Sequence, residues 1–338
     1  MTEKSYGGST RIPKPKEITK TKNNQTSSLI INQETKMETK SETISQEQIE
    51  KYKQAGEIAK QIKSYAKTII KPQSSLKEIA EKIENKIIEL GGKPAFPTNL
   101  SINEQAAHVT PSFNDDNKAQ GLLKVDIGVQ IDGYIADTAF SIDLENSEEN
   151  KNLIKAAESA LKSALETISL KTPINKIGEK IEKAITEKNA EPIRNLSGHL
   201  LDEYELHAGV TIPNYNNNQE IEIEEGAYAI EPFATSGHGA VRDGKPSGIY
   251  RLENENQVRD YFAREVLKFI KEEYQTLPFC SRWLVKKFST RALIALKRLE
   301  EANIIHQYPQ LIEKNNGKVA QAEDTVIITK KEKIVTTS

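Results

Sequence analysis

The chain has 338 residues, enough for one large or two ordinary domains, and 36% of them are hydrophobic. Its formal net charge of −2 excludes a general attraction to nucleic acid or acidic membranes. The single cysteine, Cys280, excludes an internal disulfide and fits a reducing compartment, and no apolar run has the length of a membrane span or a signal-peptide core. We therefore expect a soluble cytoplasmic protein, part of which is unpacked.

Residues 1–44 are the part that we expect to be unpacked. They are rich in Lys, Thr, Ser, Asn and Gln, lack sustained periodicity and carry a charge of +3. Such a segment cannot bury enough apolar surface to offset its ordering entropy, so we predict a disordered tail. A weak contact with RNA or the ribosome is the alternative to a solvated tail without a specific role. Met37 lies just before the folded part, and we hypothesise that it is an alternative start.

Two helices, over about 45–70 and 75–90, are predicted next, and the second of them is repeated later in the chain. Residues 76–87 align without gaps to residues 174–185, and six of the twelve aligned positions are identical. A long helix precedes each copy (45–70 and about 147–170), a proline separates each pair, and strands follow. We infer two similar α/β halves, related by a pseudo-two-fold axis, with their strands joined into one sheet.

Residues 122–144 predict a hairpin that carries two acidic residues. Apolar residues alternate up to Asp132-Gly133, a pair that favours a two-residue type I′ turn. In the resulting register Asp137 faces Gly128, so it is the diagonal neighbour of Asp126 on one face of the hairpin. Asp is depleted in strand interiors, and buried unpaired carboxylates are unfavourable. A divalent metal site and a solvated polar face are the two interpretations, and from these residues alone both stay open.

The second half offers further polar residues in apolar surroundings. His199 follows a glycine, His207 lies in a His-Ala-Gly sequence, and Glu231 is in the predicted strand 227–235. Glu323 is in a last predicted strand, 319–329. A site at the join of the halves would draw ligands from both, although each residue alone is also compatible with an ordinary structural role.

Between the second half and the last strand, residues 248–312 change to an all-helical pattern, with helices over 258–274, 281–288 and 290–302. A helix-turn-helix or winged-helix shape would suggest nucleic-acid binding. The excess of basic residues is modest and no basic stripe is evident, so we favour a structural lid that contributes side chains to the pocket. The predicted domains are therefore the tail 1–44, a catalytic domain of 45–247 and 313–338, and this inserted subdomain.

From residue 45 onwards the chain resembles the methionine aminopeptidases, specifically the type II form with a helical insertion, in the archaeal style. Six segments carry the resemblance. They are PAFPTNLSINEQAAHVTP (94–111), KVDIGVQIDGYIADTAF (124–140), NLSGHLLDEYELHAGVTIPNY (195–215), EEGAYAIEPFATSGHG (224–239), LPFCSRWL (277–284) and AQAEDTVIIT (320–329).

The resemblance implies an α/β (α+β) pita-bread fold and removal of the initiator methionine from nascent proteins when the second residue is small. It implies five ligands for two divalent ions. Asp126 would hold one ion, His199 and Glu231 the other, and Asp137 and Glu323 both. The ions would be Mn, Co, Fe or Zn, and they would activate a bridging water.

The resemblance also implies roles around the metals. Glu231 would shuttle a proton, and His108 and His207 would contact the substrate and donate to the scissile carbonyl. Phe96, Leu206 and Tyr308 would line the methionine pocket. The implied partner is the N-terminal methionine of nascent chains, with a ribosome contact open and a monomer expected. Two alternatives are a proline-directed peptidase of the same fold and a non-enzymatic RNA- or ribosome-binding relative.

Overall fold

The computed structural model describes residues 44–254 and 256–338. The predicted tail, apart from Ile44, and the hypothesised start at Met37 lie outside these residues. Within the described part of the chain, none of the helices combines the length and the apolar character that crossing a membrane requires.

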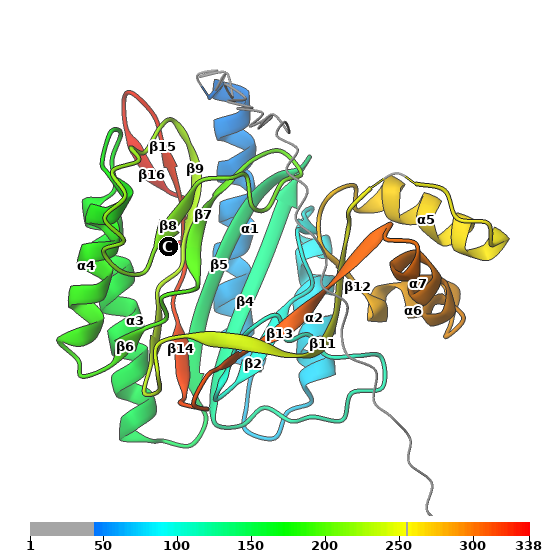
Figure 1. The fold of residues 1–338 in the computed structure, drawn as a ribbon, viewed down its shortest axis with the longest axis horizontal. Helices are drawn as coiled ribbons and strands as arrows, with labels where there is room; N and C mark the ends of the chain where they lie inside the picture. The colour runs from blue at the N-terminus through cyan, green and yellow to red at the C-terminus, as the bar shows by residue number, and fades with distance from the viewer. Residues whose placement is uncertain (1–43, 255) are drawn as a thin grey trace, which may run out of the picture. The chain divides into compact units, whose positions relative to one another are not determined.

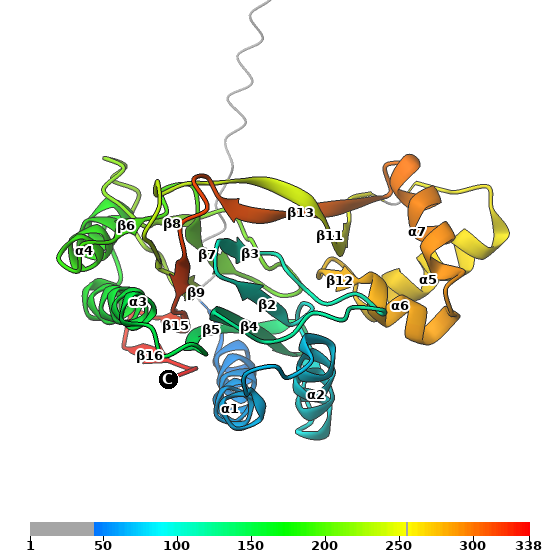
Figure 2. The ribbon, with the colours of Figure 1, turned by 90° about the horizontal axis from the view of Figure 1, so that it is seen from below.

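The first half consists of two helices followed by a small antiparallel sheet (Figure 1). The helices are α1 (Gln46–Ile69) and α2 (Leu76–Glu89), and the sheet consists of β1 (Lys93–Pro94), β2 (Asn99–Ile102), β4 (Leu122–Ile131) and β5 (Tyr134–Asp143). A further strand of this half, β3 (Gln105–Ala107), belongs to a different sheet. Ser45 and Gln48 exchange hydrogen bonds at the start of α1 and form a capping box. Helices α1 and α2 pack against β4 and β5 and bury one apolar face of the sheet (Figure 2).

The second half repeats this order. Its elements are α3 (Glu148–Thr167), α4 (Ile174–Thr186), β6 (Glu191–Pro192), β7 (Ser197–Leu201), β8 (Thr211–Pro213), β9 (Gly226–Ile230) and β10 (Phe233–Thr235). Three pairs of elements begin 98 residues apart in the two halves, namely α2 and α4, β1 and β6, and β2 and β7. The prediction of two related halves is thereby confirmed, and the repeat extends beyond the helices in which it was seen. The expectation that their strands join into one sheet is wrong, because β4 of the first half and β9 of the second belong to separate sheets.

The predicted hairpin is confirmed residue by residue. Asp132 and Gly133 both have positive φ, at 49° and 88°, as a type I′ turn requires. Asp126 pairs with Ala139, and Gly128 pairs with Asp137. Almost every side chain of β4 and β5 up to Phe140 is buried, so both faces of this hairpin are covered.

Two predicted strands are broken where they carry an acidic residue. The strand predicted over 227–235 is split into β9 and β10, with Glu231 and Pro232 between them. The strand predicted over 319–329 is split into β14 (Val319–Gln321) and β15 (Asp324–Ile328), on either side of Glu323. Strand β14 pairs with β10, and β15 pairs with β9. Each glutamate therefore lies where the chain passes from one sheet to another.

The two halves meet along β5 and the β14–β15 segment, where hydrogen bonds from threonine hydroxyl groups to the backbone take the place of most backbone–backbone hydrogen bonds. The backbone of Glu323 pairs with that of Ala139 through an isolated bridge. Thr325 Oγ1 accepts from the backbone N–H of Asp137 and donates to its carbonyl, both at 2.8 Å. Thr138 Oγ1 donates to the carbonyl of Glu323 at 2.8 Å. These bonds fix the backbones of Asp137 and Glu323 relative to each other.

The end of the chain contacts the same segment. Strand β16 (Lys333–Val335) pairs with β15, and the Thr337 hydroxyl accepts from the backbone N–H of Thr325 at 2.9 Å and donates to Asp324 at 2.8 Å. Lys63 of α1 also donates to Asp324, at 2.8 Å. The last residues therefore fasten β15 to the first half.

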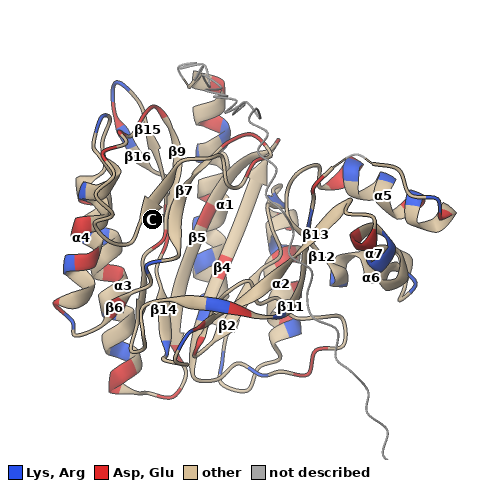
Figure 3. Cartoon of the chain, viewed as in Figure 1, with Lys and Arg blue, Asp and Glu red and all other residues tan. Residues whose placement is uncertain are grey.

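The segment between the second half and β14 contains three helices with their own apolar core. Its elements are β11 (Val241–Leu252), α5 (Tyr261–Glu273), β12 (Phe279–Cys280), α6 (Ser281–Phe288), α7 (Ala292–Glu301) and β13 (Ile305–Glu313). Strands β11 and β13 pair and run from the second half to these helices (Figure 1). Acidic and basic residues are mixed along α5 and α7, as along α3 and α4, whereas α6 has basic residues and no acidic ones (Figure 3). That residues 248–312 form a separate subdomain stays our proposal.

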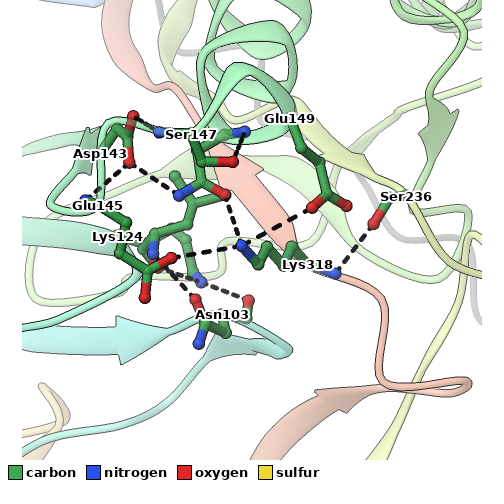
Figure 4. A network of polar contacts seen from close by, with 10 residues as sticks. Asn103, Lys124, Asp143, Glu145, Ser147, Glu149, Ser236 and Lys318 are labelled. Carbon is green, nitrogen blue, oxygen red and sulfur yellow. Dashed lines mark hydrogen bonds and ion pairs between the residues drawn. The ribbon is translucent and has the colours of Figure 1, made fainter.

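A polar network ties the start of α3 to the end of β5 and to Lys318, which directly precedes β14 (Figure 4). Asp143 accepts from the backbone of Ser147 and from the Asn150 amide, both at 2.8 Å, and Lys318 donates to the Asn150 side chain at 3.0 Å. Beside it, the buried ammonium of Lys124 donates to the carbonyl of Asn103 at 2.7 Å. These bonds satisfy groups that burial would otherwise penalise, and they hold the linker between the halves in place.

A buried ion pair ties the helical segment to the first half. Arg282 of α6 donates two hydrogen bonds to Glu84 of α2, at 2.7 and 2.8 Å, and both side chains are almost fully buried. Arg282 also donates to the carbonyl of Pro111 at 3.0 Å, and Glu84 accepts from the backbone of Thr98 at 3.2 Å. The pair therefore connects α6 to the two loops that flank β2 and β3.

We predict that Arg282→Met lowers the free energy of unfolding by about 3–5 kcal/mol, because it leaves the Glu84 carboxylate buried without its partner. Urea denaturation would measure this loss. Lys86→Met is the matched control, since Lys86 forms a pair of similar length, 2.9 Å, with Glu89 on the exposed side of α2. That change should cost at most about 1 kcal/mol. Equal effects of the two substitutions would contradict the role given to the buried pair.

Candidate metal centre

All ten side chains singled out from the sequence line one cavity of about 230 Å³. They come from both halves and from β13, and none is left outside. They are Phe96, His108, Asp126, Asp137, His199, Leu206, His207, Glu231, Tyr308 and Glu323. Their common placement makes this cavity the candidate site.

The β4–β5 hairpin supplies the first two carboxylates. Asp126 and Asp137 lie on the same face because Asp137 pairs with Gly128, two residues from Asp126 along β4. A side chain at position 128 would collide with Phe96, since a Cβ built there lies 2.3 Å from the Phe96 ring. Gly128 therefore lets the aromatic ring approach the two carboxylates closely.

The other three candidate ligands approach from the opposite side. His199 is on β7, and Glu231 and Glu323 are at the two strand breaks described above. His199 Nε2 lies 3.8 Å from Asp137 Oδ2 and 3.6 Å from Glu231 Oε1. One donor atom each from Asp137, His199 and Glu323 lie within 4.8 Å of one another, and all three residues are buried. This spacing allows one ion to contact all three.

Burial and mutual repulsion change the proton affinity of these groups. Burial raises the pKa of Asp126 to about 7. Burial and then the nearby carboxylates raise the pKa of Asp137, of Glu231 and of Glu323 well above their ordinary values. Burial, with a contribution from His207, lowers the pKa of His199 to about 3. The imidazole is therefore neutral and able to bind a cation at physiological pH.

These residues fit a divalent cation. Oδ1 of Asp126 and Oδ1 of Asp137 are buried and have no hydrogen-bond partner. Within residues 44–254 and 256–338, no lysine or arginine forms an ion pair with any of the four carboxylates. Unpaired buried carboxylates are costly unless a cation compensates them, and several carboxylates with one imidazole suit a transition-metal ion. This is the metal interpretation that the hairpin alone had left open.

Two more imidazoles lie beside the carboxylates. The ring of His207 lies 4.4 Å from that of His199, centroid to centroid. His108 follows β3 with a positive φ of 58°, and its Nδ1 lies 3.3 Å from the carbonyl of Pro309. If Nδ1 carries the proton, it donates to that carbonyl, and Nε2 is left for a ligand. A non-glycine residue in the left-handed region is uncommon and often marks a functional site.

An apolar slot adjoins these polar groups. Phe96 is buried, and Leu206 and Tyr308 are partly buried. The Tyr308 ring lies 5.1 Å from that of His108 and comes from β13, which also pairs with β3. The cavity therefore combines a charged end and an apolar end, as ligand sites commonly do.

Several further residues at this site were not predicted from the sequence. Asn99 of β2 lines the cavity, as do Asn195, Leu196, Ser197, Phe233, Ile249, Pro278 and Leu311. The Thr325 and Thr138 hydroxyls orient the ligand strands without lining the cavity. Asn99 could have been predicted from the sequence only if the pairing of β2 with β4 had been predicted together with the hairpin register.

A larger cavity, of about 550 Å³, lies between α2 and the helical segment. It is lined by aromatic side chains and by the Glu84–Arg282 pair, whose charges neutralise each other. It contains no histidine and no unpaired buried carboxylate. The smaller cavity is therefore the better candidate for chemistry.

We predict that Mn²⁺ affinity rises with pH through the range around pH 7. Asp126, with a pKa of about 7, and the other carboxylates with raised pKa hold protons at lower pH, and a cation must displace these protons. Each displaced proton should change the affinity roughly tenfold per pH unit. Calorimetric titrations at pH 6 in two buffers of different ionisation enthalpy would count the released protons. Binding at pH 6 without proton release would contradict the raised values.

Residues 50–330 match the family model of metallopeptidase family M24. A methionine aminopeptidase of Methanocaldococcus jannaschii is 44% identical, over 85% of this chain and 98% of that protein. One of Thermococcus onnurineus is 47% identical, over 84% of this chain and 97% of that protein. The matches therefore span nearly the whole of these relatives.

Solved structures share the fold at lower identity. A thermophilic Arx1 is 18% identical with a TM-score of 0.74, over 87% of this chain and 91% of that one. A methionine aminopeptidase from Thermotoga maritima is 19% identical with a TM-score of 0.63, over 88% and 98%. A prolidase from Pyrococcus furiosus is 19% identical with a TM-score of 0.56, over 88% of this chain but 65% of that one. Together with the relatives, these findings establish that the chain belongs to metallopeptidase family M24 and, within it, to the methionine aminopeptidases.

Proposed function

We propose that this protein hydrolyses the peptide bond after an N-terminal methionine when the second residue is small. The observation that carries the proposal is the cavity that joins an acidic, metal-ready cluster to an apolar slot. The proposed substrate is the nascent polypeptide, and the proposed compartment is the cytoplasm. We further propose that the protein acts as a monomer, with a ribosome contact left to experiment.

The proposed centre holds two divalent ions. Asp126 would hold one, His199 and Glu231 the other, and Asp137 and Glu323 both. Mn, Co, Fe and Zn all suit this donor set. When bound, such ions neutralise the carboxylates, polarise a carbonyl and lower the pKa of water towards neutrality.

The remaining roles belong to the chain's own side chains. Glu231, at the edge of the cluster with its side chain 16% exposed, is our candidate for carrying a proton from the attacking water to the leaving amine. His108 and His207 would donate hydrogen bonds to the scissile carbonyl and to the oxyanion that develops from it. Donation from His108 requires a proton on Nε2. Because Nδ1–H would donate to the carbonyl of Pro309, this is the imidazolium form, which burial disfavours by lowering the pKa of His108 and which a developing oxyanion favours.

The apolar slot supports the choice of methionine. Phe96, Leu206 and Tyr308 would surround the unbranched thioether side chain, which fills irregular apolar space well. The cavity of about 230 Å³ leaves little room beside that slot. A bulky second residue would therefore be excluded sterically.

Two alternatives remain for experiment. A proline-directed peptidase is less favoured because the prolidase from Pyrococcus furiosus is 19% identical to this chain, whereas the methionine aminopeptidases compared above are 44% and 47% identical. A binding protein without catalysis is less favoured because the five candidate ligands and both histidines lie together. Turnover of Met-Ala-Ser but not of an Xaa-Pro dipeptide, and its loss with EDTA, would separate the three functions.

We predict that Asp137→Asn or Glu231→Gln abolishes turnover of Met-Ala-Ser while the fold is retained, because each removes a charge needed for the proposed ions. Release of methionine and circular dichroism would measure the two properties. Glu222→Gln is the control, since Glu222 is half exposed and pairs with Lys171 on the surface. Near-normal turnover in either site variant would refute the assignment.

We predict that His108→Ala lowers kcat by about 10²–10³, the effect of losing one donor to a developing oxyanion. Steady-state kinetics with Met-Ala-Ser would show the loss mainly in kcat. The exposed His238, which is not part of the cavity lining, is the matched imidazole, and His238→Ala should leave kcat within twofold. An unchanged rate in His108→Ala would remove this residue from the site.

A further inference from the structure

Asn99 is placed beside the candidate metal ligands by the sheet itself. It is the first residue of β2, and its Cα partner on β4 is Asp126. Side chains that are directly opposed in an antiparallel pair lie on the same face, close together. The Asn99 amide therefore lies next to the Asp126 carboxylate, and it lines the same cavity.

The orientation of this amide is set by a neighbouring carbonyl. Asn99 Nδ2 donates to the carbonyl of Pro97 at 2.9 Å. The flipped amide would place Oδ1 against that carbonyl, and two acceptors cannot form a hydrogen bond. Oδ1 must therefore point away from Pro97, and there it has no hydrogen-bond partner although the side chain is only 5% exposed.

An unpaired buried acceptor is costly, so its retention in a ligand cavity suggests that a ligand supplies the donor. The acidic neighbours are committed to cations in the proposed centre. The amide oxygen, in contrast, stays neutral over the physiological pH range and cannot be protonated there. It remains an acceptor whether or not the carboxylates are occupied.

We infer that Asn99 Oδ1 accepts a hydrogen bond from the free α-amine of the substrate, which makes Asn99 a specificity-determining residue. This inference rests on the proposed function. Asn99 lies three residues from Phe96, at the proposed methionine slot, and directly opposite Asp126. The α-amine of a bound N-terminal methionine must lie between its side chain in that slot and its carbonyl at the histidines, where this oxygen is available.

The test compares two ligands that differ only in the amine. They are L-methioninamide and its des-amino analogue, 4-(methylthio)butanamide. Calorimetry with the Mn²⁺-loaded full chain gives the affinity ratio of the two, which we call the amine preference. Asn99→Leu removes the acceptor at nearly constant volume, and Asn99→Ala serves as a second variant if leucine impairs folding. Asn175→Leu is the matched control, because Asn175 on α4 is also buried with an unpartnered Oδ1 but does not line the cavity.

We expect the amine preference to fall about tenfold in both Asn99 variants and to be unchanged in Asn175→Leu, as the loss of one hydrogen bond to a charged group implies. The amount of Mn²⁺ bound per chain should stay the same. An unchanged amine preference would overturn the inference and leave the proposed function intact. Loss of bound Mn²⁺ would also overturn it, since Asn99 would then be a metal ligand. A wild-type protein that binds neither compound would refute the proposed function and the inference together.

Discussion

Four carboxylates and an imidazole are buried against one another where the two halves meet, and this arrangement is unfavourable by itself. Desolvation and like-charge repulsion both act on Asp126, Asp137, Glu231 and Glu323. The surrounding structure compensates by fixing the backbones that carry them. The Thr325 hydroxyl contributes most, because it accepts from the backbone N–H of Asp137 and donates to the carbonyl of the same residue. A site whose ligands repel each other can be kept in place only by a rigid frame.

Much of this frame could be predicted from local patterns, because those patterns have local causes. Asp132-Gly133 determines its turn through backbone preferences, and the turn determines the register that brings Asp137 beside Asp126. The repeat of residues 76–87 likewise revealed two halves, since similar helices imply similar packing. The breaks at Glu231 and Glu323 were not predicted, because an apolar run reads as continuous even where its two ends join different sheets. Asn99 was missed for a related reason. Its unpaired oxygen follows from the pairing of β2 with β4 and from the position of one carbonyl, and neither is visible in a single sequence.

The helical segment contributes to the cavity indirectly. Its strand β13 carries Tyr308 and pairs with β3, which immediately precedes His108. Its helix α6 is joined through Arg282 to Glu84 and to the carbonyl of Pro111, on the far side of the same histidine loop. The segment thus holds the loop from two directions. This agrees with a wall of the site more closely than with a nucleic-acid reader, as does the mixture of acidic and basic residues along α5 and α7 (Figure 3).

The fastening of β15 by Thr337 has a consequence for the order in which the protein acquires its site. Glu323 and Thr325 are in the last stretch of the chain, and the hydroxyl that holds Thr325 comes later still. Domains form during synthesis from the N-terminal side, so both halves and the helical segment can emerge while the cluster still lacks one carboxylate and the strand that positions Asp137. This protein therefore cannot bind its cations in the final arrangement until the segment from Glu323 to Thr337 has been synthesised.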